Sequence, residues 1–298
     1  MSRKPEVEER DWDRLIEELG DGECTPFIGA GACVPTLPTT AALCEKWSKK
    51  YDYPFKEVAD LPRIMEYAAI AEGEHVTIKR RLCNEFMKQR PPDFTIDTEP
   101  HALLAKFPLP VYLTTNYDDF MVRALEHAGK RPYAATCPWY KGAPPSGLKD
   151  SVLSADTPIV YHLHGRCMQN SRRTSESLVL TESDYLEFLV NLGSDRAADG
   201  KNFIPTPILP SFTERPLLFI GYSLRDLTFR VIFEGLRNAV PRVQRRQHVS
   251  VQLPLVNKGG VADDRVKDYL VKYFRTLDIC VYWGSAEEFC TELRRRLP

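Results

Sequence analysis

The sequence predicts an α/β fold, a Rossmann-like parallel sheet with helices on both faces and a helical lobe built from two insertions. Three observations support this prediction. Short apolar runs typical of buried strands recur along the chain, amphipathic helical patterns separate them, and four of the runs end in a polar or glycine-rich turn. We expect a single domain over residues 1–298, with insertions at about residues 37–90 and 167–210.

Strands and helices are expected to alternate along most of the chain. Strands are predicted at residues 25–28, 111–114, 159–164, 217–221, 249–256 and 279–283. Helices are predicted at residues 6–19, 41–51, 99–107, 118–127, 182–192, 226–238, 265–276 and 286–297, and residues 58–89 are rich in helix formers. Residues 130–156 are rich in Pro and Gly and are predicted to be irregular. The two insertions are expected to pack together over the strand ends.

The composition excludes several classes of protein. The chain carries 40 Lys and Arg residues against 41 Asp and Glu residues, so no overall field favours nucleic acid. No apolar run approaches the roughly 18 residues of a transmembrane helix, and no signal peptide is visible, so we expect a cytoplasmic protein that does not bind membranes. The 8 cysteines include no C-x-x-C pair, which predicts reduced thiols, no disulfide, no zinc module and no other structural metal.

The four polar turns predict a ligand site. They lie in the segments PFIGAGA (Pro26–Ala32), VYLTTNYDD (Val111–Asp119), IVYHLHG (Ile159–Gly165) and LLFIGYSLRD (Leu217–Asp226). In open α/β sheets ligands bind beyond the carboxyl ends of the strands. The turns are therefore expected to place four residues around one crevice: Gly31, Asn116, His164 and Ser223.

The turn Gly29-Ala30-Gly31 follows an apolar strand and can bring backbone N–H groups close to a pyrophosphate. The third glycine of the dehydrogenase fingerprint is missing, and no acidic residue ends a second strand about 20 residues later. A hydride-transferring dinucleotide site is therefore disfavoured. A plain strand-to-helix turn stays open as the alternative.

Two of the polar residues also have ordinary structural explanations. Asn116 follows a strand, where an amide can cap the next helix or hold a ribose hydroxyl or a water molecule. Ser223 opens an S-x-x-D capping box, and its hydroxyl can in addition contact a phosphate or a ribose. Both explanations can hold together for Ser223.

His162 and His164 are two residues apart on a predicted strand, so their side chains share one face. Only His164 adjoins a glycine at the strand end. We therefore assign the role of general base to His164, at the mouth of the crevice, and a packing role to the deeper His162.

Taken in order, PFIGAGA, LTTNYDD, HLHG with LVLTESDY downstream, and FIGYSLRD resemble the sirtuin-like family. The sequence is most similar to the bacterial antiphage-defence branch of that family, whose members hydrolyse NAD. The resemblance covers nearly the whole chain.

The resemblance implies NAD as the substrate and a role for each matching residue. Gly29, Ala30 and Gly31 would approach the pyrophosphate, and Asn116 would position the nicotinamide ribose or a water molecule. Further contacts would come from Asp118, Gly221 and Ser223, with His164 as the catalytic base.

The sequence departs from the protein deacylases of the family in two ways. Thr115 stands where those enzymes carry Gln, and their four-cysteine zinc module is missing. The leading hypothesis is therefore an NAD hydrolase that cleaves the bond between nicotinamide and ribose, without a metal. A deacylase or ADP-ribosyl transferase, and a module that senses NAD without catalysis, stay open as alternatives.

The resemblance also implies an antiphage effector of abortive infection whose activity is held off until it assembles. We expect a homo-oligomer, because the chain leaves little room for a separate sensor domain. By analogy with the defence branch, the partner would be a hexameric translocating ATPase (HerA-like) or an Argonaute-like protein.

Overall fold

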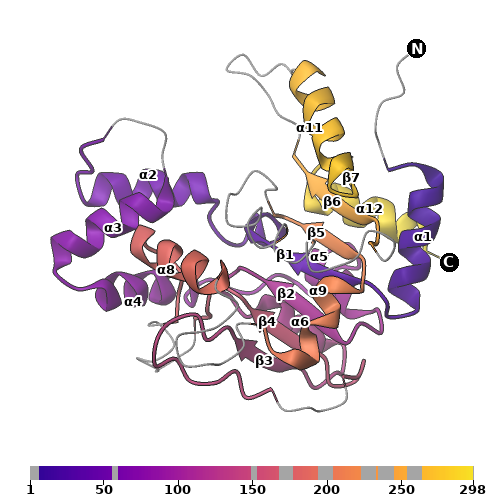
Figure 1. Cartoon of the computed structure of the whole chain (residues 1–298), viewed down its shortest axis with the longest axis horizontal. Coiled ribbons are helices and arrows are strands. Elements are labelled where there is room, and N and C mark those ends of the chain that lie inside the picture. Colours follow the sequence, from indigo (N-terminus) through magenta and orange to yellow (C-terminus); the bar gives the residue numbers. More distant parts are fainter. Residues whose placement is uncertain are drawn as a thin grey trace.

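The computed structural model describes residues 7–55, 60–148, 153–167, 177–193, 204–222, 233, 245–253 and 264–297. Within them lies a seven-stranded sheet in the order β3-β4-β2-β1-β5-β6-β7, in which every neighbouring pair is parallel (Figure 1). The strands are β1 (Thr25–Ile28), β2 (Val111–Thr114), β3 (Tyr133–Thr136), β4 (Ile159–His162), β5 (Leu217–Ile220), β6 (His248–Gln252) and β7 (Ile279–Trp283). The predicted parallel α/β sheet is confirmed.

Helices cover both faces of the sheet, as predicted. One face packs against α1 (Glu9–Gly20), α5 (Pro100–Ala105), α6 (Phe120–His127) and α12 (Ala286–Arg296). The other packs against α8 (Glu182–Gly193), the short helices η2 (Thr206–Ile208) and α9 (Pro210–Thr213), and α11 (Asp264–Thr276). Successive strand residues alternate between the two layers, so that Tyr112 enters the first core while Val111 and Leu113 enter the second. Such fully buried side chains each contribute about 1.5–3 kcal/mol to folding.

A helical lobe stands beside the sheet and is formed by α2 (Thr40–Lys50), α3 (Leu61–Glu72), α4 (His75–Phe86) and α8 (Figure 1). Its core joins apolar residues of the first insertion, such as Trp47 and Leu82, to Leu178 and Leu180 of the second. The expectation that the two insertions pack together is therefore confirmed.

A buried ion pair ties α4 to α8 within the lobe. Lys79 Nζ lies 2.7 Å from Asp184 Oδ1, and the two side chains are only 5% and 9% exposed. The other carboxylate oxygen of Asp184 accepts the backbone N–H groups of Leu180 and Thr181, at 3.0 and 2.8 Å. Asp184 thus fixes the segment that leads into α8 as well as its contact with α4.

Strand β3 was not predicted, because residues 130–156 were expected to be irregular. It lies at the edge of the sheet, pairs only with β4 among the described strands, and has one buried residue, Ala135. A strand of four residues next to proline, with one buried, two half-buried and one exposed side chain, has no clear alternation of apolar and polar side chains. No periodic pattern therefore predicts it.

The expectation of reduced thiols without a disulfide is wrong at one place. Cys83 of α4 and Cys167, 84 positions apart in the chain, form a disulfide. The pairing depends on the packing of the lobe against the end of β4, which spacing in the sequence does not reveal. The other six cysteines form no disulfide.

Some predicted elements lie outside the part of the chain that the structure describes. All of the helix expected at residues 226–238 except Phe233 is one such element, and the last residues of the strand expected at 249–256 are another. None of the described helices combines the length and apolar character needed to cross a membrane.

Replacing Lys79 by Met is expected to lower the free energy of unfolding by about 3–5 kcal/mol, because the Asp184 carboxylate would stay buried without its counter-charge. Urea unfolding followed by circular dichroism measures the change. The matched control is Lys49→Met, which removes an ion pair with Glu45 whose side chains are 75% and 68% exposed. That change should cost less than about 1 kcal/mol. Equal losses in the two variants would contradict the role of the buried pair.

Candidate functional site

The sheet order brings the four predicted turns side by side. β4, β2, β1 and β5 are consecutive neighbours, and their parallel direction puts all four carboxyl ends at one edge. From β1 the chain adds β2 on one side and later β5 on the other. This change of direction is the switch point at which open α/β sheets bind ligands.

The turn after β1 makes close backbone contact with the turn after β5. A Cβ atom on Gly29 would lie 2.5 Å from the carbonyl oxygen of Gly221, and one on Gly221 would lie 2.1 Å from the nitrogen of Ala32. Gly221 also has a φ of +69°, which side-chain-bearing residues rarely adopt. The close packing of the two turns is therefore sufficient reason for glycine at positions 29 and 221. Ala30 and Gly31 are exposed at this edge of the sheet, where a ligand can approach.

Asn116 does not cap the helix that follows it, so that alternative is wrong. The N–H of Phe120, at the start of α6, donates to Asp118 Oδ1 at 3.0 Å instead. The Asn116 side chain is 8% exposed, and its Nδ2 donates to Cys33 Sγ at 3.2 Å. Its backbone N–H donates to Thr114 Oγ1 at 2.9 Å. The carboxamide is therefore held in place by a contact with the turn after β1.

A polar network that the sequence analysis missed lies beside Asn116. Cys33 Sγ donates to Asp118 Oδ2 at 3.3 Å and lies 3.9 Å from His101 Nε2, while Glu99 Oε1 lies 2.6 Å from His101 Nδ1. Burial raises the pKa of the Asp118 carboxyl and of the Cys33 thiol. Cys33 is two residues from Gly31 and Asp118 was expected at the site, but nothing in the sequence links either of them to His101.

The predicted opening beside His164 is not found among the described residues. The ring is 3% exposed and packs edge-on against Tyr185 and Phe188 of α8, with ring centroids 5.4 and 5.0 Å away. Its Nε2 makes no hydrogen bond to any described residue. Burial lowers its pKa from 6.5 to about 3, so the imidazole is neutral at physiological pH. The prediction that His164 lies at the mouth of a crevice is wrong, because α8 of the second insertion covers its ring.

His162 is the histidine in contact with Asn116. Its Nδ1 lies 3.2 Å from the backbone carbonyl oxygen of Asn116, and burial lowers its pKa from 6.5 to about 3. β4 lies next to β2, with His162 in register with Thr114, so His162 ends the strand adjacent to that of Asn116 and His164 follows that strand. His162 thus has the packing position expected of it and also fixes the backbone of the Asn116 turn.

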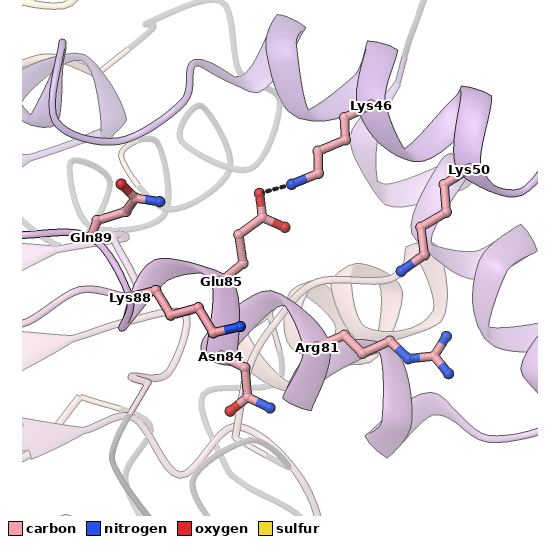
Figure 2. Close-up of a pocket in the computed structure, with 7 residues that line it drawn as sticks. All are labelled: Lys46, Lys50, Arg81, Asn84, Glu85, Lys88 and Gln89. Atoms are coloured by element: carbon pink, nitrogen blue, oxygen red, sulfur yellow. Dashed lines mark hydrogen bonds and ion pairs between the residues drawn. The ribbon is translucent and has the colours of Figure 1, made fainter.

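The described surface has cavities elsewhere. One of about 540 Å³ lies between α2 and α4 of the lobe, where Lys46 reaches across to Glu85 (Figure 2). It is lined by Lys46, Lys50, Arg81, Asn84, Glu85, Lys88 and Gln89. A second, of about 320 Å³, is lined by Arg245, Arg246, Gln247, Arg275, Asp278 and Ile279. Neither includes a residue of the four turns, so the candidate site rests on the sheet edge and its buried polar contacts rather than on cavity size.

Comparison with known families decides the assignment of the fold. Residues 110–274 match the model of the SIR2-like domain, which is more than half of the chain. The chain belongs to the SIR2-like domain family. The matched part of this SIR2-like domain runs from the start of β2 to α11 and contains Asn116, Asp118, His164 and Gly221. The turn at Gly29–Gly31 and Cys33 lie before it.

Several curated proteins that this chain resembles are named NAD(+) hydrolase ThsA. The chain is 24% identical over 258 residues to that of Acinetobacter baumannii, covering 86% of this chain and 48% of the relative. It is 24% identical to that of Bacillus cereus, covering 80% and 45%, and 24% identical to that of Enterococcus faecium, covering 83% and 47%. The chain thus spans about half the length of the curated relatives it matches.

Gly29, Ala30, Gly31 and Gly221 lie together at the switch point, and Asp118 lies on the same edge beside Cys33. Ser223 lies outside the described residues.

Acidification is expected to destabilise the protein through its buried histidines. Because the pKa of His164 is lowered to about 3 in the folded state, the unfolded state binds more protons from about pH 6.5 downward, and stability falls with pH. The loss amounts to about 2 kcal/mol for His164 between pH 7 and pH 5. Urea unfolding of wild type and His164→Gln at both pH values measures it. The variant should lose about 2 kcal/mol less than wild type, and equal losses would contradict the burial of a neutral ring.

Proposed function

We propose that this SIR2-like domain hydrolyses NAD, releasing nicotinamide and ADP-ribose. The observation that carries the proposal is the meeting of the glycine turn, the Asn116 carboxamide and the His164 turn at the switch point of the sheet. The names of the curated relatives support the same substrate. In the reaction, the bond between nicotinamide nitrogen and ribose C1′ breaks, water adds to C1′, and one proton is released.

The exposed edge at Ala30 and Gly31 suits the approach of a pyrophosphate, because there the backbone carries little side-chain bulk. In our proposal Asn116 presents its amide to the ribose or to the attacking water. Its side-chain contact with Cys33 and its backbone contact with His162 hold that amide in advance, which reduces the entropy lost on binding.

His164 is neutral and therefore in the protonation state of a general base. Its ring is enclosed by Tyr185 and Phe188, so it reaches a substrate only if α8 moves. We therefore propose that the described arrangement is a resting state. Opening of the lobe would then bring the imidazole to the water beside Asn116.

The enclosure of His164 also favours a second candidate, a module that binds NAD without cleaving it. Such a module needs the glycine turn and Asn116 but no accessible base. It predicts a rise in melting temperature with NAD and no release of nicotinamide. Thr115 and the lack of a C-x-x-C pair in the sequence give no support to a deacylase.

An enzyme that destroys NAD requires an off-state in its own cell. We propose that assembly supplies the switch: a homo-oligomer, with a hexameric translocating ATPase (HerA-like) or an Argonaute-like protein as the partner class. We further propose that the protein acts in the cytoplasm as an antiphage effector of abortive infection.

Asn116→Ala and His164→Ala are each expected to lower the rate of nicotinamide release by about 10²–10⁴-fold, since each removes a group that positions or activates the water. Chromatography of nicotinamide from full-length protein incubated with NAD, alone and with the partner, measures the rate. His127→Ala, an exposed histidine at the end of α6, is the matched control and should keep the wild-type rate.

Absence of nicotinamide release by the assembled wild type would end the hydrolase proposal, and a melting shift with NAD would then favour the binding module. In infected cells, abortive infection requires that cellular NAD falls with wild type and not with Asn116→Ala. Equal NAD levels would contradict that role.

Assembly is expected to control activity through α8. Size-exclusion fractions of known mass should release nicotinamide only when assembled, and Tyr185→Ala should raise the release by the unassembled fraction because it opens one side of the His164 ring. Leu186→Ala, an exposed neighbour on α8, is the control and should leave that release at its basal level. A fully active wild-type monomer would contradict the proposed off-state.

A further inference from the structure

We propose that Cys33, His101 and Asp118 form a binding site for one zinc-class divalent cation. The three residues come from different parts of the chain: the 3-10 helix η1 (Ala30–Cys33), α5, and the turn after β2. One ligating atom from each, a sulfur, an imidazole nitrogen and a carboxylate oxygen, lies within 4.8 Å of the other two.

Two of the three distances between the ligand atoms are close to those of tetrahedral coordination. Bond lengths of about 2.3 Å to sulfur and about 2.0–2.1 Å to nitrogen and oxygen place tetrahedral ligand atoms about 3.3–3.6 Å apart. Cys33 Sγ lies 3.3 Å from Asp118 Oδ2 and 3.9 Å from His101 Nε2. Shifts of a few tenths of an ångström bring these two contacts to the tetrahedral values, and the third pair, His101 Nε2 and the Asp118 oxygen, lies within 4.8 Å and closes further when an ion binds.

The groups around the three ligands already orient them. Glu99 Oε1 lies 2.6 Å from His101 Nδ1, which leaves Nε2 directed at Cys33. Asp118 accepts the backbone N–H of Phe120 on Oδ1, which leaves Oδ2 for the cluster. A carboxylate behind a ligating histidine is the usual second shell of a zinc site.

The donor set selects the class of ion. Thiolate and imidazole favour zinc or another borderline metal over magnesium and calcium, which prefer oxygen ligands. Binding replaces the proton of the Cys33 thiol by a sulfur–metal bond, and that proton is released to solvent. Three protein ligands leave a fourth coordination position for water or a substrate oxygen.

The site adjoins Asn116, whose Nδ2 donates to Cys33 Sγ at 3.2 Å. Metal binding at Cys33 therefore alters a contact that holds the Asn116 carboxamide. Any effect of the ion on nicotinamide release rests on the proposed function, whereas binding itself does not.

The test titrates chelator-treated full-length protein with Co²⁺ in the absence of NAD and follows the thiolate-to-cobalt charge-transfer band. One equivalent should produce the band, and Zn²⁺ should displace it. Cys33→Ser should abolish the band, and Glu99→Gln should weaken cobalt affinity about 10–100-fold through His101. Cys280→Ser, at another free cysteine, is the control and should retain the band.

Circular dichroism checks that each variant is folded, and His101→Gln is the second ligand variant if Cys33→Ser fails to fold. It should weaken affinity more than Glu99→Gln does, because loss of a ligand costs more than loss of its second shell. A wild type without a stoichiometric band, or a band that survives in both ligand variants, would overturn the proposal. Because the readout needs no NAD turnover, it is independent of the hydrolase assay.

Discussion

Backbone contact between the turns that follow β1 and β5 is the constraint on which the rest of the site depends. Gly221 fits only because it has no Cβ atom and adopts a positive φ, and it receives the N–H of Gly31 at 2.8 Å. This contact fixes the start of η1 and so the position of Cys33, the last residue of η1. Cys33 Sγ in turn accepts a hydrogen bond from the side-chain amide of Asn116. The turns on both sides of the switch point are thus fixed as one unit.

The site combines a preorganised half with an enclosed half. Asn116 is held by a hydrogen bond from its side chain to Cys33, in the turn after β1, and by one between its backbone carbonyl and His162, at the end of β4. His164 is held by aromatic packing, and its pKa is lowered by burial. Burial keeps the imidazole neutral, as a base requires, but also separates it from water. The same α8 residues that stabilise the resting protein therefore oppose its proposed chemistry, which is the conflict between stability and activity common to functional sites.

The sequence was sufficient to predict the strands around the site because their apolar runs are short, fully buried and each followed by a polar turn. The sheet order then placed Asn116 and His164 after neighbouring strands, as the motifs implied. Three features were out of reach. β3 is a strand of four residues with one buried side chain, too short for a periodic pattern, and the cover over His164 depends on how α8 packs. The contacts of Cys33 with His101 and of Cys83 with Cys167 join residues 68 and 84 positions apart.

Besides apolar packing, an ion pair and a disulfide connect the elements of the lobe to one another and to the turn that carries His164. The Lys79–Asp184 pair joins α4 to α8, so moving α8 by itself would separate a buried ion pair. Moving the lobe as one body keeps the pair intact. Cys83 of α4 is linked to Cys167, only three residues beyond His164, so such a movement must also pull on the turn that carries the histidine. The disulfide is unusual for the proposed cytoplasmic location, where thiols are kept reduced. Its reduction would release the His164 turn from the lobe while leaving the ion pair in place.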